Sequence, residues 1–458
     1  MLAVLRPGSV AETQQALVIA SRTQVPIYPL SRGFNWGYGS RVPRQDAAVV
    51  LELSRLRRIS GFDDELGTVT VQAGVSFAEL AAFLRRRGPA WMLSVTGGSP
   101  DASVLANALE RGVGFGVGGN RIETVCALEV ALATGELVRT GFARYPRARA
   151  AGVQRLGLGP ALDGLFAQSN LGVTTAATVW LTRRPRWAAW IDVRIPRRDL
   201  PAALSIYRAL LGSGTLRGVI KINNGYAVAM SSIPPMAVDA GWAGTLPWAG
   251  RIHVGGDDRA ELGARLGHIE RSLRGRAALH VHRGRIRPFD EVEGPYAGTP
   301  SGVGLSVLSF GRPAQAADAS PEPSGVLFLC PAVPLRGAAV KEAVELLARA
   351  ALDAGFLPYI TLNIMDERVV HVVFGLFYDR EAAGADRRAM RAYRRAFAAC
   401  IARGYYPYRL GLQSMGELPA FADDSAAVLA RLRAALDPAG VLGRGLHEGR
   451  SRKGRSGR

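Results

Sequence analysis

Residues 29–39 read PLSRGFNWGYG and begin where a predicted strand, residues 25–30, comes to its end. Glycine adopts positive φ angles easily, so the N–H groups of such a loop can turn toward one side. Inward-facing N–H groups bind phosphate oxygens, and Arg32 adds a cation beside them. Neither the Gly-x-Gly-x-x-Gly spacing nor the Lys-Ser/Thr of a P-loop is present. The stretch predicts an anion-binding loop, although by itself it is also typical of an ordinary glycine-rich surface loop.

Four further segments follow this loop in a fixed order. They read ASVLANALERGVG (102–114), LEVALATGELVRTG (128–141), DGLFAQSNLGVT (163–174), and, near the end, YR (408–409) with LDPAGVL (436–442). Together with the loop, they resemble the vanillyl-alcohol oxidase and p-cresol methylhydroxylase family. The resemblance covers nearly the whole chain. It is dense over residues 6–185, thin over 186–324 and clear again towards the C-terminus.

The resemblance implies an α+β fold with three regions. Residues 1–185 would form an FAD-binding domain of two α+β subdomains, and residues 186–404 a cap domain with an antiparallel sheet. Residues 405–458 would return to the FAD-binding domain, with a disordered basic tail from about residue 448. The sequence agrees with the first boundary, because longer strands and helices are predicted after Arg184-Pro185.

Short sequence patterns predict the positions of two helix starts, a loop and two hairpins. Ser9 with Glu12, and Ser76 with Glu79, have the spacing of a capping box and predict two helix starts. The segment 314–324 is rich in Ala, Pro, Ser and Asp and predicts a loop. Hairpins are predicted at residues 129–139 and 359–378.

The resemblance also implies which residues hold FAD. The loop would bind the pyrophosphate, a helix would line the flavin or the pyrophosphate, and a later segment would give backbone contacts on the adenine side. A dianionic pyrophosphate needs many N–H donors, which a glycine-rich loop supplies. The residues implied are Ser31, Arg32, Gly33, Phe34 and Asn35 in the loop, Ser103 and Asn107 in the helix, and Gly172 and Val173 in the later segment.

In the family, a phenolic substrate is held as its phenolate by two tyrosines and an arginine. The matching residues here are Tyr38, Tyr408 and Arg409. A phenolate oxygen favours short O–H donors and a fixed cation. The same arginine would lie near the flavin N1 and C2 carbonyl, where it would bind cofactor and stabilise the anionic reduced flavin. The alternative is that both tyrosines only pack on FAD.

The chain departs from the family at several active-site positions. The family aspartate beside the flavin N5 aligns with Gly98, and an active-site tyrosine aligns with Phe115. Asp101 lies on the same loop as Gly98 and is a candidate for the acid–base role. His371 matches the first histidine of a family pair whose second member is Val372 here. It is either a proton relay or a histidine of the core.

The position of the family's covalent FAD link aligns with Val326, and Phe34 stands where other members of the superfamily carry a linking histidine. We therefore predict FAD that is bound without a covalent link. A covalent link raises the potential of the flavin, so its absence favours a substrate that is easier to oxidise. A product of a specialised metabolic route is then as plausible a substrate as a simple para-alkylphenol.

Composition narrows the remaining classes of protein to which the chain could belong. The chain has 458 residues and a formal charge of +19, which invites a nucleic-acid hypothesis. Nearly all of the positive charge is scattered arginine, without a basic stripe interleaved with aromatic residues, so we predict no nucleic-acid partner. Three widely spaced cysteines form no disulfide framework or metal motif. No signal peptide and no membrane span are evident, which predicts a cytoplasmic protein.

The sequence thus predicts an FAD-dependent oxidase or dehydrogenase that transfers a hydride from a small substrate, phenolic or specialised, to the flavin N5. Oxygen or another acceptor would re-oxidise the flavin, and a homodimer is compatible with the family. The alternative is a flavin-binding protein of the same fold with altered or non-redox chemistry, which the losses at Gly98 and Phe115 motivate.

Overall fold

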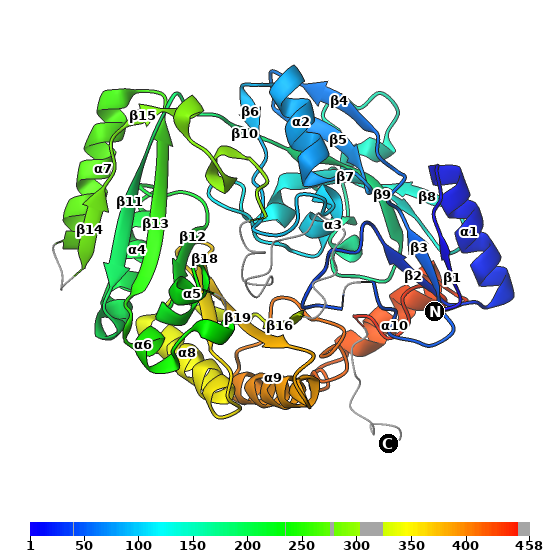
Figure 1. Cartoon of the computed structure of the whole chain (residues 1–458). Coiled ribbons are helices and arrows are strands. Elements are labelled where there is room, and N and C mark those ends of the chain that lie inside the picture. The colour runs from blue at the N-terminus through cyan, green and yellow to red at the C-terminus, as the bar shows by residue number, and fades with distance from the viewer. Residues whose placement is uncertain (40, 234, 275–278, 303–323, 448–458) are drawn as a thin grey trace.

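The computed structural model describes residues 1–447 except 40, 234, 275–278 and 303–323. The predicted loop at 314–324 lies outside the described residues apart from Ser324, and so does the predicted basic tail. Two bodies lie side by side: one contains the N-terminal strands and the C-terminal helix, and the other is built around a large sheet (Figure 1). The mixture of helices with antiparallel sheets confirms the predicted α+β fold.

The first body contains a small parallel sheet and a larger antiparallel one that share a hydrophobic core. In the described residues the parallel sheet has the order β1 (Ala3–Leu5), β3 (Val49–Glu52), β2 (Ile27–Leu30). The antiparallel sheet has the order β4 (Ile59–Asp63), β5 (Thr68–Gln72), β9 (Val173–Trp180), β7 (Val125–Ala131), β8 (Leu137–Arg139). The helices are α1 (Val10–Thr23), α2 (Phe77–Arg87) and α3 (Val104–Leu109), and a short pair joins β6 (Trp91–Met92) to β10 (Thr182–Arg183).

One predicted capping box is complete and the other is half formed. At α2 the Ser76 hydroxyl accepts from the Glu79 N–H, and the Glu79 carboxylate accepts from the Ser76 N–H. At α1 the Ser9 hydroxyl accepts from the Glu12 N–H, but the Glu12 carboxylate accepts from Gly8 instead. The glutamate finds a free N–H one residue earlier, so the helix start is right and the reciprocal bond is not.

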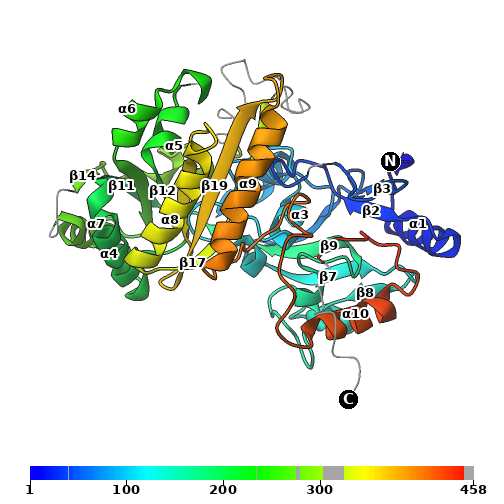
Figure 2. The ribbon, with the colours of Figure 1, turned by 90° about the horizontal axis from the view of Figure 1, so that it is seen from below.

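The second body is built on an antiparallel sheet that the described residues form with the order β14 (His280–Arg283), β11 (Trp187–Ile195), β13 (Trp248–Gly256), β12 (Ile220–Asn223), β18 (Tyr359–Ile364), β19 (Val369–Asp379), β16 (Ser324–Leu329). Two short strands, β15 (Arg287–Pro288) and β17 (Ala332–Pro334), extend β11 and β19. The associated helices are α4 (Leu200–Gly212), α5 (Gly225–Met230), α6 (Ala240–Thr245), α7 (Arg259–Arg274), α8 (Gly337–Leu352) and α9 (Ala385–Ala402). Figure 2 shows α8 and α9 lying across one face of the sheet.

Alternation along these strands gives the sheet two different faces. In β12, for example, Ile220 and Ile222 are buried in the core beneath the helices, whereas Lys221 and Asn223 point to the other face. That second face is turned toward the first body, and its polar side chains are available to a ligand. The strands β12 and β13 were not predicted from the sequence.

The C-terminal segment returns to the first body. After α10 (Ser425–Leu436), the Asp437 carboxylate accepts from the N–H groups of Val441 and Leu442. The Ile27 N–H donates to the Val441 carbonyl at 2.8 Å, and both Val441 and Leu442 belong to the core of the first body. Among the described residues, no helix is both long and apolar enough to cross a membrane, and no cluster of side chains could hold a metal ion.

Candidate active site

A cavity of about 690 Å³ lies between the two bodies. The first body contributes residues of the glycine-rich loop, of α3 with the loops beside it, and of the start of β9. The second body contributes the polar face of its sheet. Every residue predicted to hold FAD lines this cavity: Ser31, Arg32, Gly33, Phe34, Asn35, Ser103, Asn107, Gly172, Val173 and Arg409.

The glycine-rich loop has the geometry of an anion cradle. Gly33 and Gly37 take φ angles of +75° and +76°, which a side chain would strain. The backbone N–H groups of residues 32–36 have no hydrogen-bond acceptor among the described residues. The Nε of Arg32 is buried and also lacks an acceptor within the described part of the chain. Because buried donors are normally paired, this loop fits a bound phosphate group.

The helix α3 presents a second unpaired group. Its cap, Ser103, accepts from the Ala106 N–H and donates to the Ala73 carbonyl, so the hydroxyl is committed to the fold. Asn107, one turn later, has a buried Oδ1 without a partner in the described residues. A Cβ at Gly112 would lie 2.3 Å from that oxygen, so glycine there makes room for the amide. The amide is therefore free to bind a cofactor atom.

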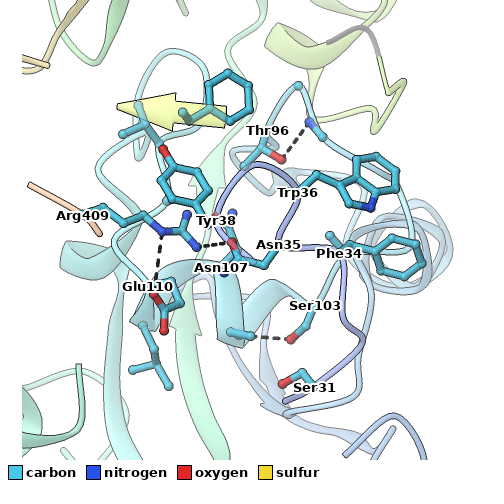
Figure 3. A pocket seen from close by; sticks show the side chains of 18 of the residues that line it. Ser31, Phe34, Asn35, Trp36, Tyr38, Thr96, Ser103, Asn107, Glu110 and Arg409 are labelled. Carbon is cyan, nitrogen blue, oxygen red and sulfur yellow. Dashed lines mark hydrogen bonds and ion pairs between the residues drawn. The ribbon is translucent and has the colours of Figure 1, made fainter. Parts of the chain in front are cut away.

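Three side chains gather at the end of the cavity where the C-terminal segment crosses the loop. The Arg409 guanidinium lies 4.2 Å from the centre of the Tyr38 ring, donates to Asn35, and has its Nε 3.7 Å from Glu110 (Figure 3). Tyr408 follows directly in the sequence and lines the same cavity. The structure thus brings together three residues that the resemblance named, although they come from opposite ends of the chain.

The phenols in this cluster are neutral. Burial raises the pKa of both Tyr38 and Tyr408 well above its ordinary value, and the Arg409 charge opposes that rise only in part. The Tyr38 hydroxyl lies 3.0 Å from the Cys330 sulfur, a free and buried thiol. Two O–H groups and one fixed cation are thus present where an anionic oxygen could bind.

The two candidate acid–base residues are not brought to the cavity. Asp101 does not line it, and its carboxylate lies 3.9 Å from the Arg32 guanidinium. His371 lines a smaller cavity of about 350 Å³, which it shares with Tyr408, and its ring stacks on Tyr408 at 3.9 Å. Burial lowers the pKa of His371 to about 4, so the imidazole is neutral near pH 7.

At the two cavity positions that depart from the family, Gly98 leaves space for a side chain and Phe115 is aromatic. Gly98 lines the cavity, and a Cβ there would have only the Thr96 hydroxyl within 4 Å, at 3.4 Å. Phe115 also lines the cavity and packs edge-on against Tyr296 at 5.2 Å. Among the described lining residues, Glu110 is the one carboxylate, and it is paired with Arg409. No histidine or cysteine is among them.

Sequence reasoning missed the residues that the sheet contributes. Lys221, Arg251 and Asn363 line the cavity from three strands. A lysine inside the apolar alternation Ile-Lys-Ile of residues 220–222 was the available signal, because the chain has so few lysines.

A family model described as an FAD binding domain matches residues 1–141. The 1'-carboxy-chondrochloren decarboxylase of Chondromyces crocatus is 37% identical, over 97% of this chain and 90% of the relative. The chain belongs to the vanillyl-alcohol oxidase and p-cresol methylhydroxylase family. The family predicted from the sequence is confirmed.

Other members agree with this assignment. The 4-cresol dehydrogenase (hydroxylating) flavoprotein subunit of Pseudomonas putida is 24% identical over 89% of this chain and 80% of the relative. Substrate-bound p-cresol methylhydroxylase superposes with a TM-score of 0.85 at 21% identity, covering 97% of this chain and 88% of that one. The 4-ethylphenol oxidase of Gulosibacter chungangensis gives 0.86 at 23%, covering 98% and 89%.

As a member of this family, the protein is a flavoprotein with FAD as its cofactor. The free N–H groups of residues 32–36, the unpaired Arg32 Nε and the unpaired Asn107 Oδ1 fit such a ligand. The free N–H groups of residues 32–36 would bind the pyrophosphate. The cluster around Arg409 is then left for the end of the cofactor that reacts.

Proposed function

We propose that this protein oxidises a 4-hydroxyphenyl substrate, which it binds as the phenolate between Tyr38, Tyr408 and Arg409. The observation that carries the proposal is this cluster of two buried phenols around one guanidinium. A buried anion is strongly destabilised unless it is paired and hydrogen-bonded, and the cluster offers both kinds of partner. Because Tyr38 and Tyr408 keep their own protons, the substrate is the phenol that ionises.

Ionisation prepares the substrate for oxidation. A phenolate oxygen donates electron density through the ring to the para carbon, so the C–H bond on that carbon's substituent becomes a good hydride donor. FAD supplies the two-electron acceptor for the hydride. The substrate is left as a quinone methide, and O2 or another acceptor re-oxidises the cofactor.

A second candidate extends this reaction to oxidative decarboxylation. It is favoured by the 37% identical relative, whose name is that of a decarboxylase. Hydration of a quinone methide needs a base to deprotonate water, but the described cavity lining offers no carboxylate other than Glu110, which is paired with Arg409. Loss of CO2 needs no base, so it is the fate that fits this cavity.

The electrons balance if the carboxylate is on the carbon next to the benzylic one. Hydride loss takes two electrons from the phenolate carboxylate and leaves a neutral quinone methide ring with its carboxylate. Cleavage of the bond to the carboxyl carbon then returns two electrons to the ring. The products are a vinylphenolate, CO2 and the two-electron-reduced cofactor.

The first test is anaerobic flavin reduction by 4-alkylphenols, followed by the loss of flavin absorbance. We expect reduction by the phenols and none by the corresponding 4-alkylanisoles, which cannot form a phenolate. Equal reduction by phenols and anisoles would overturn the phenolate mechanism. No reduction by any 4-hydroxyphenyl compound would overturn the proposed function.

The second test follows the fate of the carboxylate in 3-(4-hydroxyphenyl)propanoate carrying an isotope label in that group. Labelled CO2 and 4-vinylphenol are expected. Gly98→Asp is the matched variant, because the space beside Gly98 admits a side chain. A carboxylate there would act as a base, so the share of hydrated product should rise. Hydrated product from the unaltered protein would overturn the decarboxylation candidate and leave the oxidation in place.

We also propose that FAD is bound without a covalent link. The aliphatic side chain of Val326 on β16 cannot form one, and the described cavity lining contains neither histidine nor cysteine. Acid precipitation should leave a colourless pellet and a yellow supernatant. A yellow pellet would contradict the proposal.

A further inference from the structure

A row of polar side chains runs across the face of the sheet that borders the cavity. The register pairs Lys221 on β12 with Asn363 on β18, and Asn363 with His371 on β19. On the other side, β12 and β13 pair Ile222 with Gly250, and continuing this register sets Lys221 opposite Arg251. Cross-strand neighbours lie close together, so Lys221 stands between a guanidinium and an amide.

Lys221 is a cation without an anion. Its Nζ lies 3.9 Å from the centre of the Phe115 ring, and this ammonium group forms no ion pair or hydrogen bond with a side chain or carbonyl of the described residues. Burial lowers the pKa of this lysine to about 8, which is the effect expected when an ammonium group has lost water and gained no carboxylate. Asn363, beside it, has a buried Oδ1 that also lacks a partner in the described part of the chain.

The charges that line the cavity can be assigned one by one. The described lining carries four cations, Arg32, Lys221, Arg251 and Arg409, and one anion, Glu110. Arg32 belongs to the phosphate loop, and Arg409 to the phenolate cluster with Glu110. Arg251 forms an ion pair with Asp192 through two of its nitrogens. Lys221, which is partly exposed to the cavity, is the lining cation left without an anion among the described residues.

We infer that Lys221, with Asn363 beside it, binds a carboxylate of the substrate. This inference rests on the proposed function, because it names the second end of the 4-hydroxyphenyl substrate. The uncommitted ammonium donates to the carboxylate, and Asn363 takes part through its Nδ2–H group, because its Oδ1 is an acceptor like the carboxylate oxygens. So few donors match a planar monoanion better than a phosphate, which would need several. The aromatic rings of Phe115 and Tyr296 would form the apolar wall beside the substrate chain.

The subsite also favours release of the product. A carboxylate that leaves as neutral CO2 gives up its attraction to Lys221, so the product binds more weakly than the substrate. Lys221 is thus a residue for binding and specificity, and the phenolate cluster remains the place of oxidation.

A series of ligands with increasing chain length tests the subsite without relying on the oxidation. Phenylalkanoates with one to four methylene groups and their primary amides are titrated into the FAD-loaded protein by calorimetry. These compounds have no phenol and are not oxidised by the proposed route. We expect one chain length at which the acid binds best, and a clear preference for that acid over its amide. Lys221→Met should reduce the preference by about 30-fold or more, as for a truncated buried charge pair.

The controls separate a binding role from a structural one. Lys221→Arg should restore part of the preference, and Lys341→Met, which removes a surface lysine paired with Glu345, should leave it unchanged. FAD content and circular dichroism identify a variant that fails to fold. If Lys221→Met fails to fold, the test rests on Lys221→Arg.

The outcomes of the two proposals are distinguishable. Acid preference that Lys221→Met removes supports the subsite, even where no 4-hydroxyphenyl compound reduces the flavin and the proposed function fails. Absence of acid preference at every chain length overturns the subsite, even where phenols are oxidised. A Lys221→Met variant that keeps its acid preference and only slows re-oxidation by O2 also overturns it.

Discussion

The two walls of the active-site cavity are built in different ways. The wall from the first body consists of continuous segments: the loop at residues 29–39, the helix α3 and the start of β9. Its ligand groups are largely backbone N–H groups that glycines expose. The wall from the sheet consists of single side chains, one from each of several strands, such as Lys221, Arg251 and Asn363.

The difference corresponds to what we propose that each wall binds. A cofactor shared by a whole family is held by backbone geometry, which short sequence segments encode. A substrate particular to one member is held by side chains in a cross-strand row, where one substitution changes the chemistry without changing the sheet. The following experiments test this division between the two walls.

The largest effect is expected at Arg409, which belongs to neither wall and links the loop to the C-terminal segment. Arg409→Ala removes the cation beside Tyr38 and leaves Glu110 unpaired. Loss of one fixed group that stabilises an anion slows a reaction by about 10²–10³-fold, and we expect the upper end for flavin reduction by a 4-alkylphenol. Stopped-flow absorbance measures the rate constant.

Arg403→Ala is the matched control, since Arg403 pairs with Glu342 on the surface. It should leave the rate constant within about twofold, as exposed ion pairs contribute little. A loss of less than tenfold in an Arg409→Ala variant with full FAD content would contradict the phenolate role.

The next effect concerns pH and the sheet wall. Burial lowers the pKa of Lys221 to about 8, and the carboxylate binds only to its protonated form. Affinity for a phenylalkanoate should therefore be constant below pH 8 and fall about tenfold per pH unit above it. Burial holds the pKa of His253 at about 3 and that of Tyr296 at about 12, so these neighbours keep their charge between pH 6 and 10.

Calorimetry over this pH range gives the dissociation constants, and the primary amide is the control because it carries no charge. An amide whose affinity falls in parallel would assign the pH dependence to the fold. An acid whose affinity does not change up to pH 10 would remove Lys221 from the site.

A smaller effect is expected in the loop wall. Gly33→Ala places a side chain at a φ of +75° and against the side chain of Arg41, which costs about 1–2 kcal/mol. Relief of this strain moves the N–H groups of the loop, so FAD should bind about tenfold more weakly. Gly355→Ala is the matched control, because Gly355 has a φ of +77° with open space around it and does not line the cavity. It should lower stability to heat similarly without changing the FAD dissociation constant. Equal FAD affinity in the two variants would show that the loop tolerates a side chain.

The smallest effect is expected at His371, which lies behind Tyr408 and not in the main cavity. Its pKa, which burial lowers to about 4, keeps it neutral throughout the working range. His371→Gln should change flavin reduction by less than about threefold and leave the pH profile between 5.5 and 8 unaltered. A large loss with a displaced inflection would instead make His371 a proton relay.

Much of the first body could be predicted because its signals are local. The glycine-rich loop, the Ser76–Glu79 capping box and the hairpin at residues 129–139 each depend on neighbours in the chain. Even the pairing of Tyr38 with Arg409 was accessible, because family resemblance carried the long-range information. The strands β12 and β13 were missed, since β12 has only four residues and β13 contains three glycines, so neither shows a long apolar alternation.

By itself, the sequence indicated an α+β flavoprotein of this family. Its resemblance to the family also picked out the loop at residues 29–39 and the three residues Tyr38, Tyr408 and Arg409, whose roles stay predictions. Only the tertiary structure decided that Asp101 faces Arg32, that His371 stacks behind Tyr408, and that Lys221 lines the cavity. For His371 and Lys221 the physical reason is strand register, whereas the place of Asp101 depends on the path of the loop before α3. A change of one residue reverses which side chains meet the cavity, and register is fixed by the packing of the whole sheet against its helices.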